Sequence, residues 1–407
     1  MEQSKDDLIL ISVDDHICEP ADMFDAHVPA KYRELAPRVR TEADGTEQWY
    51  YGDIKGRHTG LNAVAGKPPE MYDMDANRFS DMRAGCYRVD ERVRDMSAGG
   101  QLAGLNFPNW TGFGGQVLNQ GPDPKVNEVM IKAYNDWHVD EWCGAHPDRF
   151  IPCGILPYFD IEVAAKEVHR LAAKGCHAVA FSENPEALGM PSVHSGAWDP
   201  LFAACDEEGT VLCVHIGSSS RMPPTMTDSP ATVMLTLTPV MSVTALAELL
   251  WADFWSKFKN LRICLSEGDI GWMPYFVFRA QHVHERHFGW TGKRFPDGLD
   301  PTTLFRERFI CCFIDEPVGL ENLDHFNLDN VCWEGDYPHS DGVWPDGPES
   351  VAQVMRDIPD DVVNRITYEN AMRHFRFDPF SRRPRERCTV GALRAEATDV
   401  DTTTRVA

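Results

Sequence analysis

The 407-residue sequence has few basic residues and no long apolar run. Its 39 lysines and arginines stand against 63 aspartates and glutamates, which leaves a net charge of −24. Binding to nucleic acid or to an anionic membrane requires a basic face, so neither partner is expected. No apolar run approaches the roughly 20 residues of a membrane span. Residues 1–7 also lack the basic and apolar regions of a signal peptide.

No Cys-x-x-Cys pair occurs among the 12 cysteines, and several of them, such as Cys213, Cys264 and Cys312, lie inside apolar runs. A free thiol in such a run behaves as a small buried hydrophobe. This pattern predicts free thiols and a reducing, cytoplasmic location rather than a disulfide framework. The glycine run 112–115 lacks the spacing of a phosphate-binding loop, and no Gly-x-Ser-x-Gly sequence occurs. A nucleotide-binding loop and a serine hydrolase are therefore not expected.

Eight short apolar runs recur along the chain, and helix-like stretches such as Ile161–Lys174 separate several of them. Most runs are continuously hydrophobic, as expected for strands that are covered on both faces. This order predicts an α/β fold, a closed parallel (β/α)8 TIM-type barrel. An open doubly wound sheet is the main alternative, but the first run lacks a glycine-rich turn after it. The runs are Leu8–Val13, Leu102–Phe107, Ile151–Pro157, His177–Ser182, Val211–Ile216, Leu261–Ser266, Phe309–Ile314 and Asn330–Glu334.

Residues 1–381 are expected to form one barrel domain, with two long interruptions. Residues 21–101 are too long for one crossover, so we expect an insertion after the first strand that covers one mouth of the barrel. The loop 217–243 is rich in Met, Pro and Thr and is either an apolar wall of a substrate site or a surface loop packed on its own side chains. The charged tail 382–407 is predicted to be disordered.

Ionisable residues follow the apolar runs where strands of a barrel would reach its catalytic mouth. Asp14 and His16 alternate by two, so both side chains leave the first strand on one face. Such a cluster of carboxylates and imidazoles suits a divalent metal, and the alternative is a hydrogen-bonded polar layer without metal. The other residues at the ends of these runs are Glu19, Glu183, His215, Glu267 and Asp336.

Four motifs resemble those of the amidohydrolase-related metal-dependent barrels. Within that family the resemblance is to the branch that includes aminocarboxymuconate-semialdehyde and resorcylate decarboxylases, and it extends over residues 8–376. It implies a metal at the carboxyl-terminal mouth of the barrel. The motifs are Asp14-x-His16-x-x-Glu19-Pro20, His215-x-Gly217, Ser266-Glu267-Gly268-x-Ile270-Gly271-Trp272 and Gly335-Asp336-Tyr337-Pro338-His339-Ser340.

By position, the resemblance makes Asp14 and His16 the first-strand ligands, His215 the fifth-strand ligand and Asp336 the eighth-strand aspartate. The sequence departs from the family at two strand ends. Glu267 stands where the decarboxylase branch carries a catalytic histidine, and Glu183 stands where dinuclear hydrolases often carry a bridging, carbamate-modified lysine. A glutamate can bridge two metals without modification.

The segment around His194 also resembles a stretch typical of the family, which adds a candidate near the mouth. The whole set is rich in oxygen donors, which favours iron or manganese over zinc. The predicted metal ligands are Asp14, His16, Glu19, Glu183, His194, His215, Glu267 and Asp336, and the predicted catalytic residues are Asp336, Glu267 and His339.

The carboxylate-rich set favours two divalent metal ions, with Fe first and Mn or Zn as alternatives. The resemblance extends to a non-heme di-iron hydroxylase of a terpenoid acyl thioester, which implies a monooxygenase that uses O2 and an external electron donor to hydroxylate an apolar acid or acyl thioester. The alternative is a metal-dependent hydrolase or non-oxidative decarboxylase of a small organic acid. A binding or scaffold protein without activity is the third possibility. The family also implies a homodimer.

Overall fold

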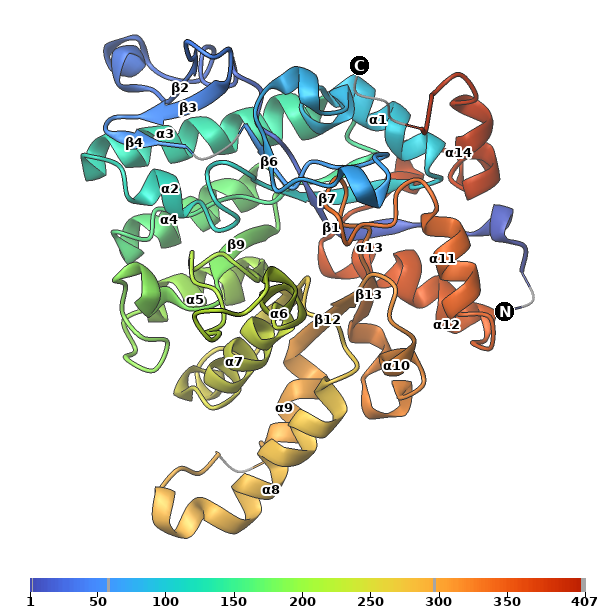
Figure 1. The fold of residues 1–407 in the computed structure, drawn as a ribbon. Helices are drawn as coiled ribbons and strands as arrows, with labels where there is room; N and C mark the ends of the chain where they lie inside the picture. The colour runs from blue at the N-terminus through green and yellow to red at the C-terminus, as the bar shows by residue number, and fades with distance from the viewer. Residues whose placement is uncertain (2, 57–58, 296–297, 404–407) are drawn as a thin grey trace.

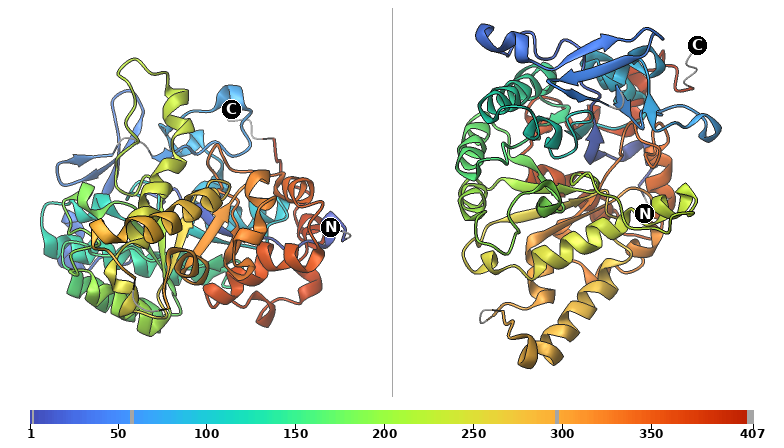
Figure 2. Two further views of the ribbon diagram at one scale, coloured as in Figure 1. Left: turned by 90° about the horizontal axis from the view of Figure 1, so that it is seen from below. Right: turned by 60° about the vertical axis from the view of Figure 1, so that its left-hand side comes forward.

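The computed structural model describes residues 1, 3–56, 59–295 and 298–403. Its centre is a set of eight parallel strands, one at each of the eight predicted apolar runs. Helices surround these strands (Figures 1 and 2). The strands are β1 (Ile11–His16), β7 (Ala103–Phe107), β8 (Phe150–Ile151), β9 (Ala178–Ser182), β10 (Val211–His215), β11 (Arg262–Ser266), β12 (Phe309–Phe313) and β13 (Val331–Trp333).

Two seams close the strands into a barrel. Strands β1, β7 and β8 form one sheet, and β9 to β13 form another. Gly154, which follows β8, forms a parallel bridge with Val179 of β9. At the other seam the Asp336 N–H donates to the Asp14 carbonyl at 2.8 Å, and the His16 N–H donates to the Tyr337 carbonyl at 2.6 Å. The (β/α)8 barrel prediction is therefore confirmed, and the open doubly wound sheet is excluded.

The strands read as continuous apolar runs because both of their faces are buried. In β9, Ala178 and Ala180 belong to one buried cluster, and Val179 and Phe181 belong to another. Alternate residues of a strand point to opposite faces, so small side chains occupy one face of β9 and larger ones the other. The twelve cysteines are all buried and free, as the sequence predicted.

The helices begin and end at the residues that local chemistry favours. Helix α4 (Ile161–Ala173) begins after Asp160, whose carboxylate accepts the N–H groups of Glu162 and Val163, and such N-caps stabilise a helix by about 1 kcal/mol. The other longer helices are α1 (Val89–Ala98), α3 (Pro124–Asp136), α5 (Asp199–Glu208), α7 (Pro239–Leu250), α8 (Met273–Thr291), α9 (Pro301–Arg308), α11 (Gly347–Val354) and α14 (Val390–Glu396). The shorter helices are α2 (Gln116–Asn119), α6 (Ala231–Thr236), α10 (Pro317–Leu320), α12 (Asp360–Asn364) and α13 (Asn370–His374).

The region between β1 and α1 carries small antiparallel sheets of its own. Strands β2 (Arg38–Thr41), β3 (Glu47–Tyr51) and β4 (Ile54–Lys55) form one, and β5 (Gly60–Leu61) pairs with β6 (Asp75–Ala76). The Leu61 N–H donates to the Asn109 side chain at 2.7 Å, just after β7. The insertion therefore lies against loops that follow the carboxyl ends of barrel strands (Figure 1).

The Met-rich segment after β10 forms a loop followed by helices α6 and α7. Met222, Met226 and Leu235 are exposed. The prediction that no apolar run approaches membrane length needs correction, because Ala231–Leu250 is 20 residues long with a mean hydropathy of 1.7. Only 33% of its apolar window is buried. The stretch passes by length and composition alone, and one such stretch is weak evidence for a membrane span.

The predicted disordered tail is structured over much of its length. Helix α14 buries Val390 and Leu393, and the Val390 N–H donates to the Leu8 carbonyl at 2.8 Å. Arg383 and Arg387 both pair with Glu396. The high charge of the tail hid this pair of apolar residues, which lie three apart and share one helix face. The prediction for residues 404–407 lies outside the described part of the chain.

Candidate metal centre

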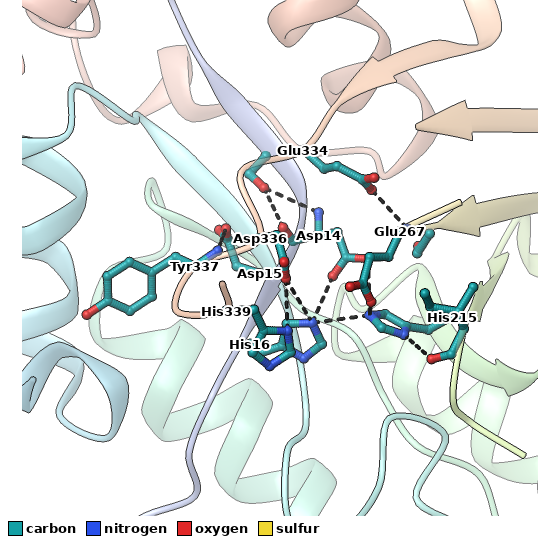
Figure 3. Close-up of polar contacts among 12 residues, drawn as sticks. Asp14, Asp15, His16, His215, Glu267, Glu334, Asp336, Tyr337 and His339 are labelled. Atoms are coloured by element: carbon teal, nitrogen blue, oxygen red, sulfur yellow. Dashed lines mark hydrogen bonds and ion pairs between the residues drawn. The ribbon is translucent and has the colours of Figure 1, made fainter. Parts of the chain in front are cut away.

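Side chains from four strand ends converge at the carboxyl-terminal mouth of the barrel (Figure 3). His16 Nε2 lies 3.4 Å from Asp14 Oδ1 and 3.4 Å from Asp336 Oδ1. His215 Nε2 lies 3.1 Å from His16 Nε2, 3.4 Å from Asp14 Oδ2 and 3.3 Å from Glu267 Oε2. Residues that are about 200 positions apart in the sequence therefore surround one point.

His339 extends this cluster from the loop after β13. Its Nδ1 lies 3.0 Å from Asp336 Oδ1, and its ring stacks on His16 with 3.8 Å between the ring centroids. Two groups of donor atoms result, each within 4.8 Å of one another, and both contain His16. The groups are Asp14, His16 and His215, and His16, Asp336 and His339.

Two residues of the cluster have backbones in the left-handed region. The φ angle of Glu267 is 54° and that of Asp336 is 52°. This conformation is costly for residues other than glycine, by about 1–3 kcal/mol, and it is concentrated at functional sites. The tight turns at these positions end β11 and follow β13, and they bring both carboxylates to the cluster.

The donor atoms fit a cation. Both carboxylate oxygens of Asp14 are buried without a hydrogen-bond donor among the described residues. His215 Nδ1 lies 2.6 Å from the Ile216 carbonyl, which can only accept, so Nδ1 carries the proton and the Nε2 lone pair faces Asp14 and Glu267. Lone pairs and carboxylates that face one another in a buried space repel unless a cation lies between them.

The electrostatics show how much these groups depend on such a cation. Burial, with Asp336 and Asp15 nearby, raises the pKa of Asp14 well above its usual value. Burial and the neighbouring His339 hold the pKa of His16 well below its usual value, so its imidazole is neutral. Burial alone would raise the pKa of Asp336, but the adjacent His339 and His16 lower it below its usual value. A neutral imidazole beside carboxylates is the state that binds a metal.

Two further buried carboxylates support the cluster and were not among the predicted site residues. Gln101 Nε2 donates to Asp15 Oδ2 at 2.7 Å, and the Tyr337 N–H donates to Asp15 Oδ1 at 3.1 Å. Glu334 Oε2 accepts the Glu267 N–H at 3.3 Å, which ties β13 to the turn after β11. Glu334 follows directly after β13, so its position at the end of a strand was the signal that could have found it.

Three predicted metal ligands have other partners in the structure. Glu19 accepts N–H groups of the loop after β7, at 3.0 Å from both Asn109 and Trp110. Glu183 accepts the hydroxyl groups of Ser218 and Ser219. His194 is 40% exposed and pairs with Glu248 at 2.7 Å. None of these three belongs to a metal-binding donor group found among the described residues. Local hydrogen-bond donors satisfy Glu19 and Glu183, and His194 lies beside the Glu248 carboxylate.

The carboxyl-terminal mouth of a (β/α)8 barrel is where the active sites of enzymes with this fold lie. Residues 24–377 match the amidohydrolase family, and the chain belongs to that family. The (β/α)8 barrel and the membership of the amidohydrolase family, both of which the sequence resemblance implied, are confirmed.

Solved structures support the fold at low sequence identity. An amidohydrolase from Mycobacterium avium subsp. paratuberculosis K-10 is 20% identical, with a TM-score of 0.70 over 90% of this chain and 99% of that chain. The IDCase of Metarhizium anisopliae is 17% identical, with a TM-score of 0.68 over 92% and 99%. The 5-carboxyvanillate decarboxylase of Novosphingobium aromaticivorans, solved with manganese and 4-hydroxy-3-methoxy-5-nitrobenzoic acid, is 16% identical, with a TM-score of 0.61 over 92% and 100%.

Proposed function

We propose that the protein is a divalent-metal-dependent enzyme that removes CO2 from a small organic acid without oxidation. One observation carries this proposal: the donor atoms of Asp14, His16, His215 and Asp336 face one buried point, and both oxygens of Asp14 lack a hydrogen-bond donor among the described residues. These four residues would hold the cation.

Two carboxylates and two imidazoles suit manganese or iron better than zinc. A bound cation would chelate the substrate carboxylate and draw electron density from it. The similar decarboxylase from Novosphingobium aromaticivorans was solved with manganese, which makes Mn²⁺ the first metal to test. Iron and zinc remain the alternatives that the sequence suggested.

Glu267 is the carboxylate that can meet the substrate. Its side chain is 18% exposed, whereas those of His215, Asp14 and Asp336 are fully buried. Burial and the nearby Asp336 raise the pKa of Glu267 well above its usual value, which favours the protonated form of this carboxyl group. Glu267 stands at the end of the sixth barrel strand, β11, where the decarboxylase branch carries a catalytic histidine, and we assign it the role of proton donor.

The proposed reaction breaks the bond between the substrate carbon and its carboxylate. The electron pair of that bond stays on the carbon, CO2 leaves, and the carbon forms a bond to the proton from Glu267. His339, whose Nδ1 lies 3.0 Å from Asp336 Oδ1, fixes the orientation of this carboxylate. The buried walls of the cluster exclude bulk water, which strengthens each of these interactions.

The test is anaerobic turnover of manganese-loaded enzyme with a panel of aromatic and aliphatic carboxylic acids. We expect CO2 release without O2, and one deuterium on the product carbon in D2O. Glu267→Gln should abolish the release, while the matched Glu248→Gln change at the exposed His194 pair should not. Cleavage of an ester or amide with no CO2 would instead establish a hydrolase, with Asp336 as the base that takes a proton from water.

A second candidate is the di-iron monooxygenase, and the number of donor residues favours it. The two overlapping donor groups together contain five residues, Asp14, His16, His215, Asp336 and His339, and Glu267 lies beside them. This enzyme would use O2 and an external electron donor to hydroxylate an apolar acid or acyl thioester, such as a terpenoid one. Two irons per chain and O2 consumption that depends on substrate would establish it. One Mn or Zn per chain and turnover without O2 would exclude it.

A further inference from the structure

A cavity of about 800 Å³ lies outside the barrel, between the insertion and the loop that follows β13. Its walls come from residues 65–72 of the insertion, residues 337–346 and the pair Thr402 and Thr403. These segments are far apart in the sequence and meet beside the barrel mouth (Figure 1). The volume lies within the range of about 300–1,000 Å³ that is typical of small-molecule sites.

The backbone holds the segment that carries Lys67 against the loop after β13. The N–H groups of Val64 and Ala65 both donate to the Pro338 carbonyl, at 2.9 and 3.0 Å. The Lys67 N–H donates back to the Val64 carbonyl at 2.8 Å, in a turn that places Gly66 at a φ of 77°. The backbone of Lys67 is therefore held close to Pro338, the residue that precedes His339.

The side chains around this cavity combine aromatic surface with a free cation. Tyr72 and Met71 are large apolar side chains that remain exposed, and Trp344 lines the opposite segment. Trp344 is held in place, because its Nε1 donates to the Asp95 carbonyl at 2.7 Å. Within the described residues, Lys67 makes no ion pair and no side-chain hydrogen bond. Asp346 also lines the cavity, but it is exposed and its charge acts on Arg394. The unpaired Lys67 ammonium beside exposed aromatic side chains is complementary to a planar anion.

The cavity is separate from the metal centre. His339 is the point where the two meet, and it is almost completely buried. Its Nδ1 and its ring face Asp336 and His16, which have no exposed surface. A molecule in the cavity would therefore reach His339 but not the carboxylates that would hold a cation.

We propose that this cavity binds a small planar organic monoanion of the aryl carboxylate type. The carboxylate pairs with the Lys67 ammonium, and the ring lies against Tyr72 and Trp344. This inference goes beyond the proposed function and does not depend on it, because the residues concerned are not metal ligands. The ligand would come either from the pool of free aromatic acids or from the enzyme's own substrate and product.

The test is equilibrium dialysis of the full-length protein with 2-naphthoate, with 2-naphthamide as the uncharged analogue. We expect one 2-naphthoate per chain, bound equally in manganese-loaded and chelator-treated protein. Lys67→Met should weaken 2-naphthoate binding by about tenfold, since a hydrogen bond to a charged group is lost. Tyr72→Ala should weaken both compounds, and Lys67→Met should leave 2-naphthamide unchanged. The matched control is Lys166→Met on the exposed face of α4.

Equal affinity in Lys67→Met and Lys166→Met would overturn the proposal, as would the absence of binding at millimolar 2-naphthoate. Binding that requires manganese and ignores Lys67 would place the ligand at the metal centre and would also overturn it. Once binding is established, turnover assays separate the two sources. Saturation of this site by substrate or product itself would identify the enzyme's own ligand, and saturation by other aromatic acids alone would identify an effector. Neither result bears on whether the metal centre releases CO2.

Discussion

Two buried carboxylates, Glu167 and Asp14, occupy opposite situations in this barrel. Glu167, on α4, is hydrogen-bonded by Asn135 at 2.7 Å and by Arg170 at 2.6 and 2.8 Å. Asp14, at the mouth, has no hydrogen-bond donor for either oxygen among the described residues. Burial of a charge is tolerated only when it is paired. The satisfied carboxylate is thus part of the scaffold, and the unsatisfied one marks the site.

The largest expected effect comes from removing the unsatisfied charge. Asp14→Asn should lower affinity for manganese by at least about 100-fold and abolish turnover, since a ligand is lost. Without metal, the same variant should be more stable than the wild type, because a buried, unpaired carboxylate is gone. Metal titration and urea unfolding of chelated protein measure the two effects. If chelated Asp14→Asn is less stable than the wild type, the contrast between the two carboxylates fails.

Manganese itself should stabilise the protein through the same cluster. At about 100 times its dissociation constant, a ligand that binds only the folded state adds about 2.7 kcal/mol to the free energy of unfolding. Thermal unfolding with and without chelator measures this difference, which should vanish in Asp336→Asn. An equal shift in that variant would show that the stabilising ion binds elsewhere.

The satisfied carboxylate should behave in the opposite way. Glu167→Gln should lower the free energy of unfolding by about 2 kcal/mol, because Arg170 loses one of its two charged partners. The loss is limited because Arg170 is partly exposed and keeps Asp136 at 2.6 Å. Metal binding and turnover should remain those of the wild type. The matched change Glu162→Gln, at an exposed position of the same helix, should alter neither quantity.

The smallest effect concerns a buried histidine outside the cluster. Burial lowers the pKa of His138 to about 3, and its Nε2 accepts the Cys153 N–H at 3.2 Å. The unfolded state binds a proton below about pH 6.5, so this stability is complete above that pH and is lost as the pH falls toward 3. Between pH 7 and 5, His138→Gln should lose about 2 kcal/mol less than the wild type.

Urea unfolding at several pH values measures that slope. Parallel curves for the wild type and His138→Gln would show that this histidine does not control acid stability. The same measurement with manganese compares His138 with the histidines of the metal cluster. Manganese should reduce the loss of unfolding free energy that the cluster histidines cause at low pH. It should leave the contribution of His138 unchanged.

The sequence predicts the barrel because its strands have to be apolar on both faces. All eight runs coincide with strands, and boundaries differ by a few residues, as at β1, which extends to His16. The run Ile151–Pro157 yields only the short β8, because its later residues contact β9 through a single bridge at Gly154. The many charged residues of the tail led to a prediction of disorder, although α14 has an apolar face. The threonines in Ala231–Leu250 made this segment look less apolar than its mean hydropathy shows.

The candidate site is less readable than the fold. Asp14, His16, His215, Glu267, Asp336 and His339 do come together, since parallel strands in a barrel all end at the same mouth. Residue type and position cannot distinguish Asp14 from Glu19 or Glu183, because all are acids at strand ends. The difference lies in nearby donors: loop N–H groups satisfy Glu19, and serine hydroxyls satisfy Glu183.

The sequence alone determined the family, the number of strands and the chemical types available at the mouth, because apolar periodicity and residue identity are local properties. Only the tertiary structure decided which carboxylates remain without donors, which imidazole lone pairs face them, and that Lys67 and Trp344 line one cavity. Those features depend on contacts between segments that are far apart in the chain. Unsatisfied buried charge exists only once the chain is folded, and it is this property that locates the candidate metal centre.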